Sequence, residues 1–327
     1  MRAVHLTGFG GPDVLRPVSV PDPDPGPGQA AVDLVCAALN HRDRWIRIGG
    51  TAALPAVLGS DGAGRVAAVG PGVEEVAVGD EVVINPALEW GEREDAPGPD
   101  YRILGVPDQG TYAERIVVAA HQLRPRPAGW SWEESAALPL AGLTAWRALR
   151  LAGAGPGRTV LVPGAGGGVA TFLVQIGAAL GARLLATAGS DAKVARALEL
   201  GAETAVDYHD PEWPQRIGEV DAVVDSVGGP TWAGVLDLLS RGGVLVSFGD
   251  TARDTAEVEI APLFLSWRRI QGTTMGSPRE FDALLAHAAE ASWRPIVDSV
   301  YPLAEAAEAH RRLEHPDRIG KVVLAVR

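Results

Sequence analysis

The chain has 327 residues, and 29 Lys plus Arg against 41 Asp plus Glu give a formal net charge of −12 at pH 7. With 46% hydrophobic and 21% charged residues it is globular rather than disordered, and its length is typical of two domains. The acidic balance disfavours nucleic acid and anionic membrane surfaces as partners, and the single cysteine, Cys36, excludes an intramolecular disulfide and a cysteine-rich metal site.

No targeting or membrane segment is predicted. Residues 1–10 lack a charged start followed by an apolar run, so we expect no secretory signal and a cytoplasmic protein. The longest uncharged stretch, 159–182, has membrane-spanning length, but it contains Pro163 and several glycines. A strand, a turn and a helix fit that stretch better.

The first part of the chain, to about Leu123, consists of short β-rich runs broken by Gly and Pro, with no convincing long helix. Strands are predicted at 30–39, 64–69, 81–85 and 112–118. We therefore expect a compact β-rich domain.

After Pro125, predicted strands alternate with predicted helices. The strands are 160–162, 183–187, 222–225 and 244–248, and the helices are 169–180, 192–200 and 231–239. Such alternation indicates a parallel sheet covered on both faces. Beyond Gly276 we predict helix 278–291, strand 295–302, helix 304–314 and strand 321–326. These elements contain no complete βαβ unit, so we expect them to pack on the first domain. The expected first domain is therefore 1–123 together with 276–327, and the second is 124–275.

A glycine-rich turn follows the first strand of the alternating region. After Val162 and Pro163 the chain reads Gly164-Ala165-Gly166-Gly167-Gly168-Val169-Ala170. Glycines let the backbone approach a pyrophosphate closely, and the N-terminus of the next helix supplies free N–H donors and a favourable dipole. Because the turn lies between a predicted strand and a predicted helix, it predicts a dinucleotide site.

The tip of the second strand carries information on the choice of cofactor. It reads Thr187-Ala188-Gly189-Ser190, without the carboxylate that binds a ribose 2′-hydroxyl in NAD-preferring proteins. Ser190 and Lys193 could instead bind a 2′-phosphate, although Asp191 could reach the ribose after a tilt of the turn. Lys193 and Lys321 are the two lysines of a chain that otherwise uses Arg. The pattern therefore favours NADPH.

Eight segments together resemble the medium-chain dehydrogenase/reductase superfamily, in its quinone oxidoreductase-like, zinc-independent branch. In chain order they are Leu39-Asn40-His41-Arg42-Asp43, Leu58 to Gly64, Val78 to Val82, Gly110 to Glu114, Leu140 to Ala145, the glycine-rich turn, Asp225 to Gly229 and Gly320 to Leu324. The resemblance covers essentially the whole chain. It implies a mixed α/β fold, with a GroES-like β-rich substrate domain, a Rossmann domain with a doubly wound parallel sheet, and a cleft between them.

The chain departs from the zinc-dependent members of that superfamily at the metal ligands. Asn40 stands where the first thiolate would be, and Gly59-Ser60-Asp61 replaces a Gly-His-Glu segment. Asn and Ser are poor zinc ligands, so we expect no catalytic metal. Asp61, Asp43 and His41 could still form a site for a hard metal ion. The loop 88–104, where relatives carry four cysteines, has none and is expected to be solvated.

The resemblance also assigns site residues. Asn40 is our first choice to contact the nicotinamide ribose or a substrate oxygen. His41 could contact pyrophosphate, relay a proton or simply lie at the surface. Asp43 is expected to orient its neighbours. Tyr112 is expected to be a packed core residue. Thr144 matches a threonine that touches the nicotinamide. The remaining cofactor contacts are expected from Gly164, Gly166, Gly167, Gly168, Val169, Ser190, Lys193, Tyr208, Ser226, Val227, Phe248, Gly249 and Met275.

Without a metal to polarise a carbonyl, the reduction should favour acceptors that delocalise negative charge themselves, such as quinones and α,β-unsaturated carbonyls. Two alternatives remain open at this point. The chain could be an alcohol dehydrogenase with an atypical metal site, or a non-catalytic, crystallin-like protein that binds NADPH.

A homodimer is also expected. The run 268–274 would form the last strand of the parallel sheet, and its edge would have unpaired hydrogen-bonding groups unless covered. The resemblance implies that two such edges pair across a two-fold axis.

Overall fold

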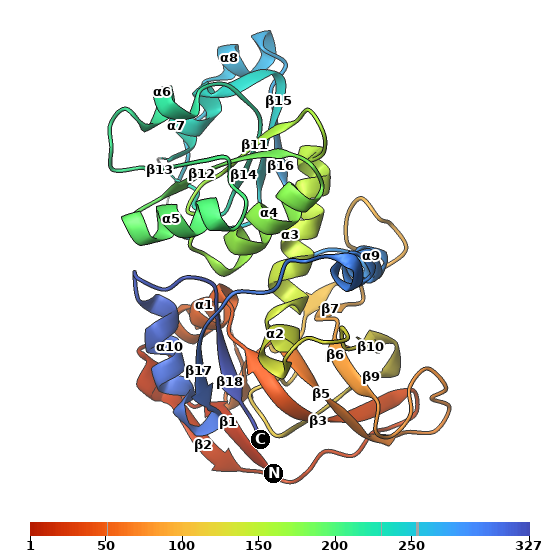
Figure 1. Cartoon of the computed structure of the whole chain (residues 1–327). Coiled ribbons are helices and arrows are strands. Elements are labelled where there is room, and N and C mark those ends of the chain that lie inside the picture. Colours follow the sequence, from red (N-terminus) through yellow and green to blue (C-terminus); the bar gives the residue numbers. More distant parts are fainter. Residues whose placement is uncertain (51, 230, 253–254) are drawn as a thin grey trace. The chain divides into compact units, whose positions relative to one another are not determined.

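The computed structural model describes residues 1–327 except 51, 230 and 253–254, and it divides into two compact units (Figure 1). Unit 1 comprises Met1–Ala141 and Ser277–Arg327, and unit 2 comprises Gly142–Gly276. The sequence pattern places residues 124–141 in the second domain, but in the structure they belong to unit 1. The reason is that β10 (Leu123–Pro125) pairs with β6 (Glu81–Ile84), and α2 (Trp132–Ala137) packs on the sheet of unit 1.

Unit 1 is built on a largely antiparallel sheet with the strand order β10-β6-β5-β3-β18-β17. Its further strands are β5 (Asp61–Val69), β3 (Gln29–Ala38), β18 (Lys321–Ala325) and β17 (Val297–Pro302), and β9 (Arg115–Ala119) also pairs with β3. Both ends of the chain thus contribute to one sheet. In that pairing, β18 near the C-terminus lies antiparallel to β3.

A smaller sheet joins β1 (Arg2–Leu6), β2 (Leu15–Ser19) and β4 (Ala56–Val57), and β7 (Ala87–Leu88) pairs with β8 (Arg102–Ile103). The α-helices of this unit are α1 (His41–Gly49), α2, α9 (Pro278–Glu290) and α10 (Ala306–Glu314), with short 3₁₀ helices at Pro12–Val14, Ala120–Gln122 and Leu303–Glu305. Helix α1 was not predicted. It has only nine residues and is mostly polar, so an isolated helix would be marginal, and buried contacts of Asp43 and Arg47 with other segments stabilise it.

Unit 2 is a parallel sheet in the order β13-β12-β11-β14-β15-β16. The strands are β11 (Thr159–Val162), β12 (Arg183–Ala188), β13 (Thr204–Asp207), β14 (Val220–Asp225), β15 (Leu239–Ser247) and β16 (Arg269–Gly272). Both faces are covered, so β11 and the centre of β15 are runs of buried Val and Leu. The expected doubly wound sheet is confirmed.

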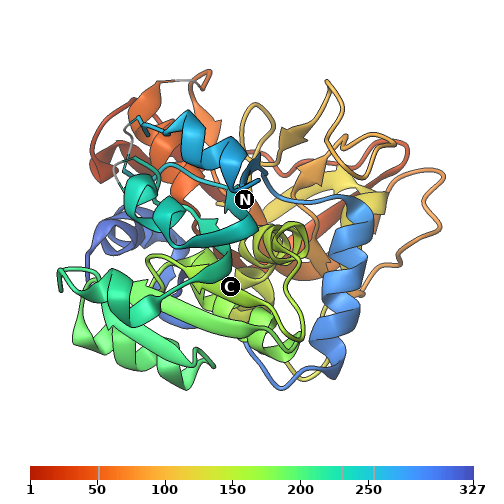
Figure 2. The same cartoon turned by 90° about the horizontal axis from the view of Figure 1, so that it is seen from above.

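The helices of unit 2 are α4 (Gly168–Ala179), α5 (Asp191–Glu199), α6 (Trp213–Ile217), α7 (Thr231–Asp237) and α8 (Ile260–Leu265). Right-handed crossovers between parallel strands place α4 and α5 on one face of the sheet and α7 on the other, as Figures 1 and 2 show. Helix α3 (Pro139–Ala152) contains the boundary between the units. Among the residues described, no helix is both long and apolar enough to span a bilayer.

Candidate functional site

The glycine-rich turn connects β11 to α4 at the carboxyl end of the parallel strands. Gly164 has φ +67°, a conformation that favours glycine, and the amide of Ala165 donates to the carbonyl of Thr187 at 2.9 Å. Gly167 precedes α4 without a side-chain cap. The first amides of α4 have no acceptor within the helix, and they form the positive end of its dipole. The local structure therefore fits a pyrophosphate group.

Lys193 reaches from α5 to the glycine-rich turn. A Cβ atom added to Gly166 would lie 2.7 Å from both Cδ and Cε of Lys193. The aliphatic part of Lys193 therefore occupies the space that a side chain at 166 would need. One reason for glycine at this position is thus a neighbouring side chain, in addition to the expected approach of a phosphate.

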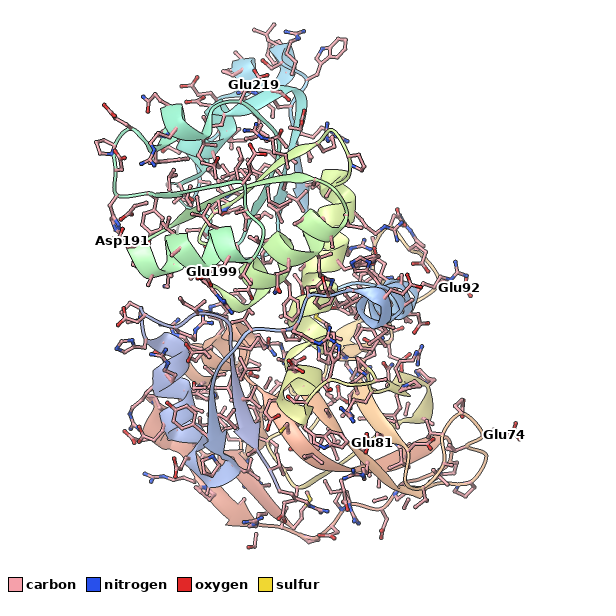
Figure 3. All side chains as sticks on the ribbon, viewed as in Figure 1. Glu74, Glu81, Glu92, Asp191, Glu199 and Glu219 are labelled. Carbon is pink, nitrogen blue, oxygen red and sulfur yellow. The ribbon has the colours of Figure 1, made fainter. Side chains whose placement is uncertain are left out.

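Two further predicted residues lie at the tip of β12. Ser190 precedes α5, whose ends, Asp191 and Glu199, are labelled in Figure 3. Tyr208 follows β13, and its amide donates to the carbonyl of Ala188 at 3.0 Å. A Cβ atom on Gly189 would overlap the Tyr208 hydroxyl, so this hydroxyl lies against the strand tip. Ser190 and Tyr208 are therefore both placed at this tip, where a ribose or its 2′-phosphate is expected.

The next two strands contribute the remaining predicted loop residues. Ser226 and Val227 follow β14, and Phe248 and Gly249 follow β15. A Cβ atom on Gly164 would touch Val227 at 3.4 Å, and one on Gly249 would lie 3.2 Å from Cβ of Ser226. The fold thus brings the loops after β11, β14 and β15 together. Thr144, in α3, and Met275, with φ +47°, are buried in unit 2.

In unit 1, Asn40 lies in a buried triangle with Lys321 and Asp61. The Lys321 ammonium donates to Asn40 Oδ1 at 2.6 Å, to Asp61 Oδ2 at 2.9 Å and to the carbonyl of Leu39 at 2.7 Å. Asn40 Nδ2 donates to Asp61 Oδ2 at 2.9 Å. The other oxygen of Asp61 accepts the amide of Leu140 at 2.7 Å. Lys321 begins β18 and Asp61 begins β5, so the sheet of unit 1 holds both charges in place.

Asp43 occupies the centre of a second buried network. Its oxygens accept the amides of Asn40 at 2.8 Å and Gly59 at 3.2 Å, and the Tyr112 hydroxyl at 3.1 Å. The Tyr112 hydroxyl lies 3.3 Å from His310 Nε2, and Arg47 Nε donates to His310 Nδ1 at 3.2 Å. Burial raises the pKa of Asp43. The carboxylate of Asp43 thus binds the backbone at the start of α1, and Tyr112 is buried.

The surroundings of His41 disfavour its charged form. Burial, together with the nearby charges of Arg318, Arg44 and Lys321, lowers its pKa to about 4. The imidazole is therefore neutral at pH 7.

Asn40, Ser60 and Asp61 stand where zinc-dependent members of the superfamily are expected to bind their metal, and their contacts do not fit a divalent cation. Asn40 and Asp61 already share the ammonium of Lys321, and Ser60 accepts a hydrogen bond from Arg42 Nη1 at 3.0 Å. Two cationic groups therefore use the oxygens that would face a metal. In the part of the chain described, no three His, Cys, Asp or Glu residues form a possible metal cluster, and this includes His41, Asp43 and Asp61.

The loop expected to be solvated has a core of its own. Trp90 is 2% exposed and packs edge-to-face on Tyr101 with ring centroids 5.2 Å apart, and its indole N–H donates to the carbonyl of Arg93 at 2.8 Å. The Ser277 hydroxyl donates to Glu94 at 2.5 Å. The acidic composition suggested solvation, but the aromatic pair provides enough apolar surface for a packed lobe.

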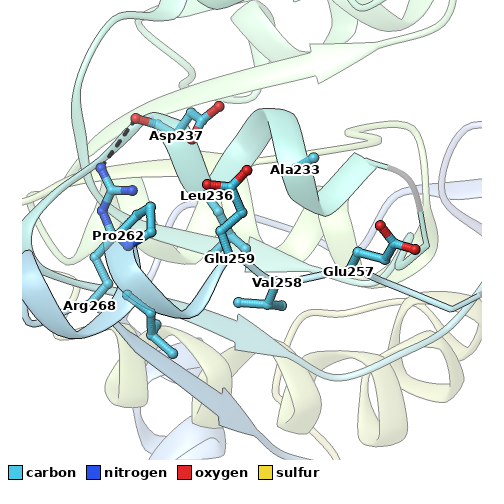
Figure 4. Close-up of a pocket in the computed structure, with 9 residues that line it drawn as sticks. Ala233, Leu236, Asp237, Glu257, Val258, Glu259, Pro262 and Arg268 are labelled. Carbon is cyan, nitrogen blue, oxygen red and sulfur yellow. Dashed lines mark hydrogen bonds between the residues drawn. The ribbon is translucent and has the colours of Figure 1, made fainter.

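A separate cavity of about 90 Å³ lies beside α7 and α8 (Figure 4). Its lining combines apolar side chains with Asp237, Glu257, Glu259 and Arg268. None of the predicted site residues lines this cavity. It is distinct from the glycine-rich turn.

Sequence reasoning did not identify the partners of Asn40 and Asp43. Lys321, Asp61, His310 and Arg47 come from strands and helices far apart in the chain, so no local pattern joins them. One signal was available for Lys321, because it is one of two lysines in a chain rich in arginine.

Comparisons with known proteins agree with this architecture. Residues 26–128 match the alcohol dehydrogenase GroES-like domain, and residues 200–324 match the zinc-binding dehydrogenase domain. A quinone oxidoreductase of Pseudomonas aeruginosa is 32% identical, and the alignment covers 99% of each chain.

Solved structures that cover the whole chain include the following two. An NAD-dependent alcohol dehydrogenase aligns over 100% of both chains with a TM-score of 0.95 and 42% identity. The quinone oxidoreductase of Escherichia coli, crystallised with NADPH, aligns over 100% of both chains with a TM-score of 0.85 and 28% identity.

Proposed function

The chain belongs to the quinone oxidoreductase-like branch of the medium-chain dehydrogenase/reductase superfamily, and we propose that it reduces quinones or α,β-unsaturated carbonyl compounds with NADPH without a metal ion. The observation that carries this proposal is the triangle of Asn40, Asp61 and Lys321. Where a metal would polarise a carbonyl, this chain holds an amide and an ammonium.

The choice of NADPH rests on the tip of β12. Lys193 lies over Gly166, and Ser190 and Tyr208 occupy the same edge of the sheet. An ammonium and two hydroxyls are suitable donors for a 2′-phosphate, and a hydrogen bond to a charged group contributes about 1.5–3 kcal/mol. The NADPH complex of the E. coli relative supports this choice, whereas the NAD-dependent relative opposes it.

We assign the pyrophosphate to the glycine-rich turn and the first amides of α4. Of the expected contacts, Gly164, Gly166, Gly167, Gly168 and Val169 form this turn, and Ser226, Val227, Phe248 and Gly249 follow the neighbouring strands. Thr144, Asn40 and Met275 remain proposed contacts of the nicotinamide half.

NADPH, when bound, supplies a hydride to an acceptor carbon conjugated with an oxygen and leaves as NADP⁺, and the reduced acceptor takes one proton from water. The chain must orient the acceptor and stabilise the charge that gathers on its oxygen. Orientation alone contributes roughly 7–11 kcal/mol to lowering a barrier. Asn40 Nδ2 uses one proton for Asp61 and retains a second for such an oxygen.

Oxidation of a simple alcohol makes a different demand. An alkoxide has no conjugated system over which to spread its charge, and a single donor of the oxyanion-hole type supplies about 2.7–4 kcal/mol. A metal ion is the usual stronger partner in such enzymes. We therefore expect simple alcohols to react orders of magnitude more slowly than conjugated acceptors.

Steady-state kinetics test the proposal. The protein is assayed with NADPH and NADH against 1,4-benzoquinone and cyclohex-2-enone, and with NADP⁺ and NAD⁺ against ethanol and benzyl alcohol. We expect the largest kcat/KM with NADPH and a conjugated acceptor. Faster turnover of either alcohol would favour the alcohol dehydrogenase alternative, and NADPH binding without any turnover would favour the crystallin-like one.

We further propose that two chains associate through the edge of β16. This strand pairs with β15 on one side, and its residues are exposed. Large apolar side chains around it and α8 are exposed as well, namely Ile260, Phe264, Leu265, Trp267 and Ile270. Pairing of two such edges would satisfy the backbone groups and cover this apolar surface.

A further inference from the structure

Lys321 is a buried cation with a complete set of partners. Its side chain is 3% exposed, and its three N–H groups point to three acceptors, the carbonyl of Leu39, Asn40 Oδ1 and Asp61 Oδ2. An ammonium has three donors and no acceptor, so this geometry uses its full capacity. Desolvation of the two charges offsets much of their attraction, so the ion pair of Lys321 with Asp61 is weak evidence for a role in stability.

The ammonium determines which way the Asn40 amide faces. Asn40 Oδ1 lies 2.6 Å from Lys321 Nζ, and Asn40 Nδ2 lies 2.9 Å from Asp61 Oδ2. Reversing the amide would place its NH₂ group against the ammonium and its oxygen against the carboxylate. Both contacts would then be repulsive. The side chain is thus held as a donor, with its oxygen already occupied.

We propose that Lys321 is a positioning residue that holds Asn40 as a polarised N–H donor toward the oxygen of the acceptor; this inference rests on the proposed function. The ammonium of Lys321, bound to the amide oxygen of Asn40, draws electron density from Nδ2. This strengthens the remaining N–H of Nδ2 as a donor. The preferred ligand atom is therefore an oxygen that gains negative charge. Lys321 supplies through Asn40 part of the polarisation that a metal would supply directly.

Replacement of the ammonium tests this role. Lys321→Met keeps the length of the side chain and removes its charge and its donors. We expect kcat to fall about 100-fold with cyclohex-2-enone and about tenfold with 1,4-benzoquinone, because the enone depends more on an external donor. The Kd for NADPH, measured by nicotinamide fluorescence, should stay within threefold. A merely structural role would lower both rates alike.

The matched control is Arg312→Met. It removes the 2.6 Å ion pair of Arg312 with Asp298 on β17, the strand that pairs with β18, and leaves the partners of Lys321 in place. We expect stability to fall and the ratio of the two rates to stay unchanged. A changed ratio in this control as well would show that the ratio follows general destabilisation, and would overturn the inference.

Chemical rescue provides a second readout. Lys321→Ala lacks the three carbons and the nitrogen beyond Cβ, and propylammonium has the same atoms. We expect propylammonium to restore at least tenfold in kcat, whereas propan-1-ol, a neutral molecule of equal length, should not. Equal rescue by both would indicate filling of space and would overturn the inference.

The outcomes separate the two proposals. A parent protein that reduces neither acceptor contradicts the proposed function. A parent that reduces both, with a folded Lys321→Met variant whose two kcat values stay within threefold, contradicts only the role of Lys321. If Lys321→Met does not fold, Asn40→Asp keeps the shape and removes the N–H, and unchanged kcat in that variant overturns the inference.

Discussion

The hydroxyl of Tyr112 lies 3.3 Å from Nε2 of His310, and 198 residues separate the two in the chain. Arg47 Nε can only donate, so Nδ1 of His310 is an acceptor and the ring carries its proton on Nε2. His310 then donates to Tyr112, and Tyr112 donates to Asp43. The segment near the C-terminus therefore takes part in fixing the start of α1, next to Asn40.

This network predicts the acid sensitivity of the fold. Burial, assisted by Arg47, lowers the pKa of His310 from 6.5 to about 3. Between these values the unfolded chain binds a proton that the folded chain does not, so full stability is present above about pH 6.5 and is lost toward pH 3. The loss from this one group is about 1.4 kcal/mol per pH unit. His41, with a pKa of about 4, contributes likewise.

His310→Asn should therefore make the free energy of unfolding less dependent on pH between 4.5 and 6.5, although it lowers stability at pH 8 by about 1–3 kcal/mol. Urea denaturation at several pH values measures this. The control is His315→Gln, whose parent side chain is 52% exposed. Equal pH slopes for His310→Asn and the parent would contradict the role of His310.

Lys193→Glu should weaken binding of NADPH by about 10–100-fold, because it replaces a partner of the 2′-phosphate by a repelling charge. Binding of NADH should change by less than threefold. Arg196→Glu is a matched control on the same helix, since it makes the same change of charge at a residue whose side chain is 37% exposed. Fluorescence titration gives both Kd values, and an equal loss for the two cofactors would show that Lys193 does not read the phosphate.

Gly166→Ala should displace Lys193 without unfolding the chain, since the added Cβ would meet the flexible part of that side chain at 2.7 Å. We expect the Tm to change little and the preference for NADPH over NADH to fall. In a chain that already carries Lys193→Met, adding Gly166→Ala should not change the preference for NADPH over NADH any further. A full additional loss in the double variant would mean that Gly166 acts on the cofactor directly.

Treatment with a chelator should leave turnover of a quinone or an enone unchanged, because Lys321 and Arg42 already use the oxygens of Asn40, Asp61 and Ser60. Elemental analysis of the purified protein should find far less than one zinc per chain. Stoichiometric zinc, with activity lost in chelator and restored by zinc, would refute this prediction.

Trp267→Glu should convert a dimer into a monomer of 34.1 kDa, because a charge would be buried beside the β16 edge. The Trp267 side chain is 76% exposed in the single chain. The control is Val78→Glu. Val78 is an exposed apolar residue of unit 1, whereas Trp267 belongs to unit 2, so this variant should leave the dimer intact. Light scattering at micromolar concentration distinguishes these outcomes, and a monomeric parent would contradict the proposed association.

The sequence alone determined the elements with strong local signals. Alternating strands and helices after Pro125 predicted the parallel sheet, and Gly164 to Gly168 predicted the turn before α4. These signals are local because hydrophobic periodicity and positive φ angles act within a few residues. The replacement of metal ligands by Asn40 and Ser60 was also visible, since it needs only a motif and its spacing.

Only the tertiary structure decided what surrounds those positions. Lys321 meets Asn40 across 281 residues, and Arg47 meets His310 across 263, so no window of sequence contains either pair. The pKa of His41 depends on burial and on charges from other segments, and the packed Trp90 lobe depends on an aromatic partner that composition alone did not reveal. Sequence patterns identify which groups are present. The sheet that joins β3, β5 and β18 decides which of them share a buried, low-dielectric space, and that proximity determines their charge and orientation.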